Sequence, residues 1–229
     1  MASRTAGNQK RSNGRRVVVG VADHNGWAIL VCAAMISGEP AVVDRRRVRL
    51  IEEGVPNQPY HHETLALSDA EAEQLLRRVE RSIASCTALA FDRLSADLSP
   101  RYRVSSITIR QPPLAHLPAT VGEVHRSYHE LCRADGMLYH SAICAAAGQR
   151  DWELVLHGRG EEVPKAAEAL RASTHDVERY VNDLRQTLGP PWTAEYRNAF
   201  AAAIAILGKR SKLRVLRAAI RSTVRKRNR

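Results

Sequence analysis

Three oxygen-bearing side chains in this sequence stand where a strand and a helix could bring them together. Asp23 follows a valine-rich run, 17–22, which is typical of a buried strand. Glu195 and Asn198 are three residues apart in a segment with helical patterning, so they share one helix face. The small side chains that follow, up to Leu207, would let this helix lie close to a sheet. Carboxylate and amide oxygens are preferred ligands of Mg²⁺, so the chemistry open to such a set is binding of a hard cation.

A second group of possible metal ligands stands in a loop. His61, His62 and Glu63 are consecutive in segment 52–67, which contains glycine and two prolines. Histidine and glutamate bind zinc, manganese or iron, but adjacent residues seldom face one ion together. Two interpretations stay open: a surface loop with incidental histidines, or a loop that folds over the strand ends so that His62 or Glu63 supplies a ligand.

Other catalytic signatures are missing from the sequence. It contains no glycine-rich phosphate loop, no dinucleotide-binding glycine motif and no nucleophile elbow. The four cysteines form no C-x-x-C pair, and we expect buried free thiols in a reducing compartment. Spacing alone identifies no cysteine–histidine nucleophile pair. Asp135 is interpreted as a surface or buried polar residue of a helix. The cysteines are Cys32, Cys86, Cys132 and Cys144.

The elements that must position these residues alternate in a recognisable order. Two apolar runs, 17–22 and 27–35, flank Asn25-Gly26 and predict a β-hairpin with a type I′ turn. Capping boxes at Ser68/Glu71 and Thr120/Glu123 predict two helix starts. The further predicted elements are a strand at 41–51, a helix to about residue 98, a strand at 104–109, a helix to Gly148, a strand at 152–157, and helices at about 164–188 and 192–207.

This order predicts an α/β protein with a mixed five-stranded sheet, β-β-β-α-β-α-β-α-α, and helices on both faces. Three antiparallel strands come first, and the strands that alternate with helices must be parallel. We expect strand 17–22 at the centre of the sheet, next to strand 104–109.

The positive charge of the chain is concentrated at its ends. The formal net charge is +11. Residues 1–16 hold five bases and residues 209–229 hold ten, with no acid in either, which leaves 20 bases against 24 acids between them. We therefore predict a basic disordered tail at 1–16, one folded domain at 17–208 and a basic amphipathic tail at 209–229. Basic arms of this kind commonly contact polyanions.

Bases in two segments are candidates for contact with nucleic acid. The C-terminal tail combines apolar residues at helical spacing with arginines and lacks aromatic anchors, which favours nucleic acid or its own domain over a membrane as partner. Alternating arginines in strand 41–51 either contact phosphate or protect a sheet edge. The candidates are Arg45, Arg47, Arg49, Lys209, Arg210, Lys212, Arg214, Arg217 and Arg221.

Apolar runs long enough to cross a membrane are missing from the sequence. No run reaches about 18 apolar residues, and residues 1–16 contain no apolar stretch. We expect a cytoplasmic protein without a transmembrane segment, and the sequence leaves open whether it forms an oligomer.

The order of elements and two short motifs resemble the ribonuclease H-like superfamily, most nearly Holliday-junction resolvases of the RuvC type. Those proteins begin with an apolar strand, an aspartate and a Gly-Trp that opens the second strand, here Asp23 and Gly26-Trp27. They end in a helix with two acids three residues apart, here Glu195 and Asn198. The resemblance implies nucleic acid as partner and phosphodiester cleavage with two Mg²⁺ or Mn²⁺ ions. Asp23, Glu195 and Asn198 would then be catalytic and metal-binding.

Two departures from the family pattern leave the activity open. The region where the family has a carboxylate, near the end of the fourth strand, reads Ile109-Arg110-Gln111-Pro112. Asn198 stands where the family has an acid, and an amide supplies no charge. His62 or Glu63 could replace a missing ligand. Three functions follow: a nucleic-acid-binding module that has lost catalysis, an active divalent-metal-dependent nuclease, or a protein-interaction module with no nucleic-acid role.

Overall fold

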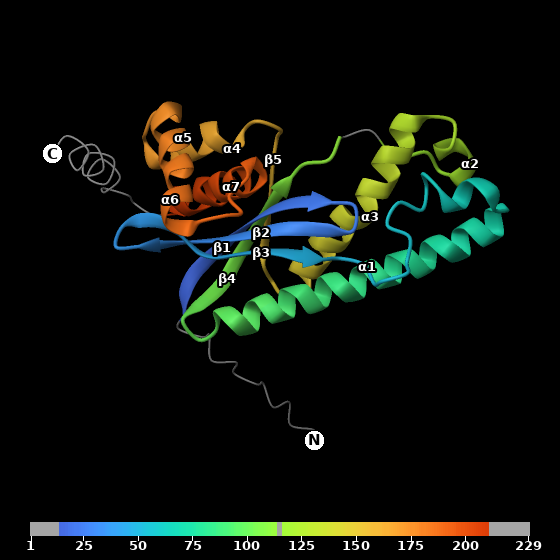
Figure 1. Ribbon diagram of the computed structural model, residues 1–229, viewed down its shortest axis with the longest axis horizontal. Coiled ribbons are helices and arrows are strands. Elements are labelled where there is room, and N and C mark those ends of the chain that lie inside the picture. Colours follow the sequence, from blue (N-terminus) through green and yellow to red (C-terminus); the bar gives the residue numbers. More distant parts are fainter. Residues whose placement is uncertain (1–13, 114–115, 211–229) are drawn as a thin grey trace, which may run out of the picture.

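The computed structural model describes residues 14–113 and 116–210 (Figure 1). Five strands form one mixed sheet in the order β3-β2-β1-β4-β5. The first three are antiparallel neighbours, whereas β4 pairs in parallel with β1 and β5 with β4. The predicted α/β fold with a mixed five-stranded sheet is confirmed, with the first strand central and next to the fourth. The strands are β1 (Arg15–His24), β2 (Trp27–Ile36), β3 (Glu39–Arg49), β4 (Tyr102–Arg110) and β5 (Glu153–His157).

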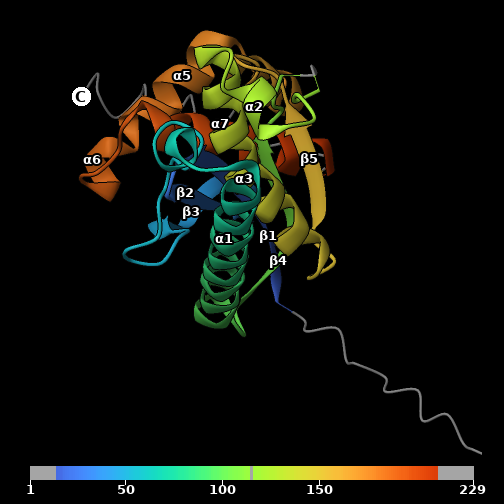
Figure 2. The same cartoon turned by 90° about the vertical axis from the view of Figure 1, so that its right-hand side faces the viewer.

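Helices cover both faces of the sheet (Figures 1 and 2). The long α1 (Asp69–Leu98) and α3 (Tyr128–Gly148) pack on one face and on each other, and α7 (Ala194–Arg210) lies on the other face against α4. None of the helices among the described residues is long and apolar enough to cross a membrane. The shorter helical elements are η1 (Glu63–Ala66), α2 (Val121–Val124), α4 (Glu162–Leu170), α5 (Thr174–Asp183) and α6 (Arg185–Leu188).

The β1–β2 hairpin is present, but its turn differs from the prediction. His24 pairs with Trp27, and only Gly26 of the two turn residues has a positive φ, 91°. A type I′ turn needs positive φ at both positions, so that prediction is wrong, and the single left-handed glycine fits a type II pattern. The strand also begins earlier than expected, since Arg15 and Arg16 pair with β4 and do not belong to a disordered tail.

Two helical segments predicted as continuous are interrupted. Segment 164–188 forms three helices, because Arg171 adopts a left-handed conformation (φ 53°) and the Ser173 side chain accepts a hydrogen bond from the Asp176 N–H to start α5. The Thr120/Glu123 capping box forms, but it starts only the four-residue α2, and a new helix begins after Ser127. The last helix passes through Gly208 to Arg210 instead of ending at the glycine.

Alternation along β1 divides its side chains between two hydrophobic cores. Val17, Val19 and Val21 pack into the core beneath α1 and α3. Val18 and Ala22 pack into the core beneath α7. Because successive strand residues point to opposite faces, this pattern determines which face each residue at the end of β1 can reach.

Candidate functional site

Close packing of α7 on β1 places the candidate residues at the end of the first strand. A Cβ added to Gly20 would lie 1.8 Å from the carbonyl oxygen of Ala199, so the helix backbone rests directly on the glycine. The small side chains that follow Asn198 allow this approach, as the alanine-rich sequence predicts. Asn198 and Glu195 are thereby brought beside the carboxyl end of β1.

The strand alternation gives Asp23 and Glu195 different partners. Gly20 and Ala22 face α7, so His24 also faces α7, where its Nε2 lies 2.9 Å from Glu195 Oε1 without hydrogen-bond geometry. Asp23 points toward the α3 face, where its Oδ2 lies 3.7 Å from Nδ1 of the buried His140. Each of the two acids therefore has a histidine as a close neighbour.

Two cavities meet at this end of the sheet. A small cavity of about 140 Å³ is bordered by Asp23, Glu195 and Asn198, so all three predicted catalytic residues line one space. A larger cavity of about 570 Å³, hereafter the cleft, lies on the α3 side and is bordered by Asp23 and His140. Arg110, the exposed last residue of β4, borders both cavities.

The side chains of this site do not fit a pair of hard divalent ions. Two ions need several converging carboxylates, whereas Asn198 is neutral and Arg110 brings a positive charge to the same space. The same space is also bordered by His24, His157 and a third carboxylate, Glu162. Glu162 Oε1 lies 3.5 Å from His157 Nδ1, and the buried Nε2 of His157 has no hydrogen-bond partner. Within residues 14–113 and 116–210 no three His, Cys, Asp or Glu side chains are arranged to hold a metal ion.

The loop histidines lie away from the predicted acids. His62 and Glu63 are exposed, directly before and at the start of η1, and neither borders the cleft or the small cavity. The structure therefore does not bring them to Asp23 as replacement ligands. Their neighbour His61 is half-buried and contacts Asp135 instead.

The three arginines of β3 have three different environments. The Arg45 guanidinium donates to the backbone carbonyls of Leu188, Gly189 and Pro191, which ties β3 to the segment before α7. Arg47 is exposed and lies over the Trp27 ring at 3.9 Å. Arg49 is exposed and pairs with Glu53 at 3.5 Å. Arg47 and Arg49 are therefore accessible to a polyanion, whereas the hydrogen bonds of Arg45 are made within the domain.

The other basic residues predicted to contact nucleic acid lie at the end of α7 or outside the described residues. Lys209 and Arg210 end α7, and nothing is described of their side chains. Lys212, Arg214, Arg217 and Arg221 lie outside the described residues.

Trp27 extends the cleft toward β3. His24 stacks on its ring with centroids 3.8 Å apart and planes 9° from parallel, and Arg47 covers the ring from the β3 side. A further cavity of about 500 Å³ is bordered by Trp27, Arg47 and Arg49 and shares Asn25, Trp27 and Asn57 with the cleft. A continuous surface with both polar and apolar side chains therefore runs from Arg110 to the exposed arginines of β3.

The burial of the cysteines differs from the prediction in part. Cys32 is buried, but Cys86 and Cys144 are half-buried and Cys132 is exposed. Sequence periodicity missed Cys132 because its helix face borders a cleft and not the core. Asp135 is fully buried, as one of the two interpretations expected.

A permanent positive charge at His140 is expected to stabilise the fold up to alkaline pH. Burial lowers the pKa of His140, but the Asp23 carboxylate 3.7 Å away and the contact with Cys144 outweigh burial and raise the pKa to about 9. Because this pKa lies above the ordinary value of 6.5, the stabilisation is complete below pH 6.5 and is lost as pH rises through about 9.

Urea unfolding at pH 6 and pH 9.5 tests this expectation on the wild type and His140→Gln. The wild type should lose roughly 3 kcal/mol more than the variant between the two pH values, since one pKa unit corresponds to about 1.4 kcal/mol. An equal loss in both proteins would show that His140 is not charged in the folded state.

Comparison with known proteins finds similar solved structures, but at low sequence identity. No protein-family model and no curated protein matches the sequence. Among solved structures, RuvC of Thermus thermophilus in complex with a Holliday junction substrate matches at 14% identity with a TM-score of 0.46, over 83% of this chain and 92% of that one. A second Thermus thermophilus RuvC structure matches at 13% identity with a TM-score of 0.45, over 82% and 92%. At these identities neither structure assigns an activity to this chain.

Proposed function

We propose that this chain is a nucleic-acid-binding module with a ribonuclease H-like fold that binds phosphate through its own cations and does not cleave it. One observation carries the proposal: Arg110 borders both cavities at the position where the family pattern has a metal-binding carboxylate. A guanidinium there repels a divalent ion and attracts a phosphate oxygen, to which it can donate two parallel hydrogen bonds.

The charge of the cleft supports phosphate binding. Among the described residues no hydrogen bond or ion pair engages Arg110, so its charge is not neutralised by a close acid. His140, which is protonated up to about pH 9, borders the same cleft, and Asp23 is the one acid among the described residues that border it. Arg133 also borders the cleft, but it is bound to Glu130 by two hydrogen bonds of 2.8 and 2.7 Å.

The side chains along this surface favour a single strand as ligand. Bases of single-stranded nucleic acid stack on aromatic and guanidinium planes while a basic groove follows the backbone. The Arg47 guanidinium, stacked on Trp27 and exposed, offers such a plane at one end of the surface, and Arg110 offers a phosphate contact at the other. We infer that a single strand lies along this surface.

Fluorescence anisotropy with a labelled single-stranded oligonucleotide, in buffer containing EDTA, tests the proposal. Arg110→Ala should weaken binding about tenfold, because a charge-assisted hydrogen bond contributes roughly 1.5 kcal/mol. The slope of log affinity against log salt should fall by about 0.7 for one lost phosphate contact.

Arg77→Ala is the matched control, since Arg77 is an exposed arginine of α1 that pairs with Glu73 and does not border the cleft. It should leave affinity and salt slope unchanged. Equal affinity of Arg110→Ala and the wild type would contradict the proposal. A wild type that binds no nucleic acid would also contradict it and would favour a protein-interaction module.

A further inference from the structure

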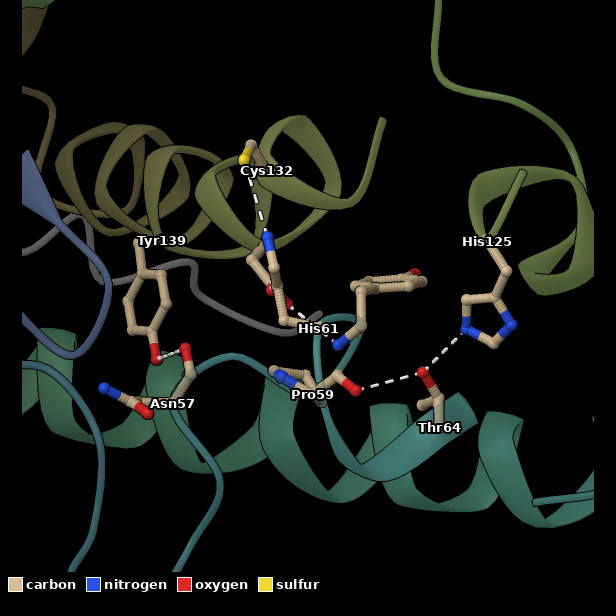
Figure 3. A network of polar contacts seen from close by, with 9 residues as sticks. Asn57, Pro59, His61, Thr64, His125, Cys132 and Tyr139 are labelled. Carbon is tan, nitrogen blue, oxygen red and sulfur yellow. Dashed lines mark hydrogen bonds and ion pairs between the residues drawn. The ribbon is translucent and has the colours of Figure 1, made fainter. Parts of the chain in front are cut away.

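A cysteine at the wall of the cleft is aligned with a histidine and an aspartate behind it. Cys132 Sγ lies 3.4 Å from His61 Nε2 (Figure 3), and His61 Nδ1 lies 2.6 Å from Asp135 Oδ2. The two contacts use opposite nitrogens of one imidazole ring, so the ring joins the thiol to the carboxylate. This is the geometry in which a histidine takes a proton from a nucleophile while a third group orients the ring.

The surrounding structure fixes each member of this cluster. Cys132 and Asp135 are three residues apart on α3 and therefore lie on the same helix face. The fully buried Asp135 also accepts a hydrogen bond of 3.0 Å from the backbone N–H of Tyr60, and the Tyr128 ring packs edge-on against His61. With two donors on its carboxylate, Asp135 holds the imidazole in one orientation.

The loop that carries His61 is fastened on both sides of it. Tyr139 Oη donates to the carbonyl of Asn57, and Thr64 Oγ1 donates to the carbonyl of Pro59 (Figure 3). Thr64 Oγ1 also contacts His125 Nε2 at 3.0 Å. His61 is thus presented to α3 by a loop with defined geometry, which a site for chemistry requires.

Proton positions follow from the two contacts of the ring. When Asp135 is ionised, Nδ1–H of His61 donates to it, and the lone pair of Nε2 is left to accept the thiol proton of Cys132. Proton transfer gives a thiolate beside an imidazolium. Burial raises the pKa of Asp135, while the hydrogen bonds from His61 and Tyr60 act in the opposite direction.

The thiol is open to a small molecule. Cys132 is exposed and borders the cleft, whose volume of about 570 Å³ is in the range of small-molecule sites. Cys144 also has a histidine nearby, with Sγ 3.5 Å from His140 Nε2, but it does not border the cleft, and the histidine lies 3.7 Å from its aspartate. Cys132 is therefore the thiol that combines a base, an orienting carboxylate and access.

We propose that Cys132 is a nucleophile that accepts an acyl group from an ester or thioester carrying a negatively charged group. His61 is the general base, Asp135 is a positioning residue, and the anionic group of the substrate is attracted by Arg110 and His140 across the cleft. The proposal goes beyond nucleic-acid binding and needs no nucleic acid.

The reaction balances with water as co-reactant. His61 Nε2 takes the thiol proton, the sulfur attacks the acyl carbon, and a carbon–sulfur bond forms as the bond to the leaving group breaks. The leaving group takes the proton from His61. A water molecule then gives a proton to His61 and attacks the acyl-enzyme, which releases the acid as the carbon–sulfur bond breaks and the proton returns to sulfur.

Full-length protein mixed with the mono-4-nitrophenyl ester of terephthalic acid, whose carboxylate cannot reach its own ester group, tests the proposal. One equivalent of nitrophenolate should be released in a burst, and peptide mass mapping should place the 4-carboxybenzoyl group on Cys132. The neutral 4-nitrophenyl benzoate should react more slowly. Cys132→Ser should give no burst, and His61→Gln should slow it by roughly a hundredfold or more, which is the usual contribution of a general base.

Cys86→Ser is the control, because Cys86 lies on α1 away from the cleft and burial raises the pKa of its thiol. It should keep the full burst. Asp135→Asn should lower the burst rate and change the pH dependence of that rate. A residue with a purely structural role would not have this effect in a variant whose circular dichroism is unchanged. Acylation spread over other residues, or an equal burst rate in wild type and folded His61→Gln, would overturn the proposal.

If these variants fail to fold, the wild type alone decides. Iodoacetamide at pH 7 should alkylate Cys132 at least tenfold faster than Cys86 and Cys144, as followed by peptide mass spectrometry. The alkylation rate of each thiol in the folded protein is divided by its rate in urea-unfolded protein. Equal ratios for Cys132, Cys86 and Cys144 would show that Cys132 is not activated.

Discussion

Truncation after Arg210 is expected to weaken binding of nucleic acid more than any single substitution. The removed segment, 211–229, carries eight bases and no acid, so the formal net charge falls from +11 to +3. Each phosphate contact contributes a slope of about −0.9 in log affinity against log salt on duplex DNA and about −0.7 on a single strand. Loss of four or more contacts should therefore lower affinity roughly a hundredfold or more at low salt and flatten the salt dependence together.

Anisotropy titrations of full-length and truncated protein at several salt concentrations measure both quantities. Truncation at Arg210 leaves α7 intact, so the folded domain is retained. Truncation that changes neither affinity nor slope would mean that the tail is not a nucleic-acid arm, and docking of the tail on its own domain would become the better interpretation.

Gly20→Val is expected to have the largest effect on stability. A Cβ at this position would lie 1.8 Å from the carbonyl oxygen of Ala199 and 2.6 Å from its carbonyl carbon, and both atoms belong to the backbone of α7. The helix must therefore move away from β1, and this movement opens a gap in the hydrophobic core between α7 and the sheet. Overpacking of a core costs about 3 kcal/mol at the upper end of its usual range, so the Tm should fall by roughly 10 °C.

Gly136→Ala is the matched control. Gly136 lies inside α3, and a Cβ there would meet no atom within 4 Å. Alanine is a better helix former than glycine by about 1 kcal/mol, so this variant should be slightly more stable than the wild type. Thermal unfolding followed by circular dichroism compares the two. A Gly20→Val variant as stable as the wild type would show that α7 does not rest on this glycine.

The order of elements could be predicted because local signals determine it. The hairpin around Gly26 and the alternation of strands and helices predicted the central position of β1 beside β4, which the structure has. The breaks at Arg171 and Ser127 were missed because apolar periodicity continues across them. Ser173 and Asp176 contained a usable signal, since serine three residues before an acid is a common helix start.

The orientation of Asp23 follows from strand alternation once the structure shows that Gly20 faces α7. Gly20, which has room only for the backbone of α7, and Asp23 are separated by three residues, an odd number, so their side chains point to opposite faces of the sheet. The resemblance to the family motif identified Asp23 but did not take into account which face of the sheet its side chain lies on. His24, at an even spacing from Gly20, reaches Glu195 instead.

The Cys132 cluster could not have been found from the sequence. His61 is separated from Cys132 by 71 residues and from Asp135 by 74, and the loop that presents it has no motif. Its geometry depends on contacts such as Tyr139 with the backbone of Asn57, which arise only after α3 packs beside the loop. Tertiary contacts of this kind leave no periodic pattern in a single chain.

Nucleic-acid binding and cleavage measured in parallel, with EDTA, Mg²⁺ or Mn²⁺, test most directly whether fixed cations replace a catalytic metal here. A single strand should be bound in all three buffers, and branched, hybrid and single-stranded substrates should all remain uncut. Calorimetry should detect no difference in Mg²⁺ or Mn²⁺ affinity between wild type and Asp23→Asn. Metal-dependent cleavage that is lost in Asp23→Asn would contradict the account and would identify Asp23 as a metal ligand.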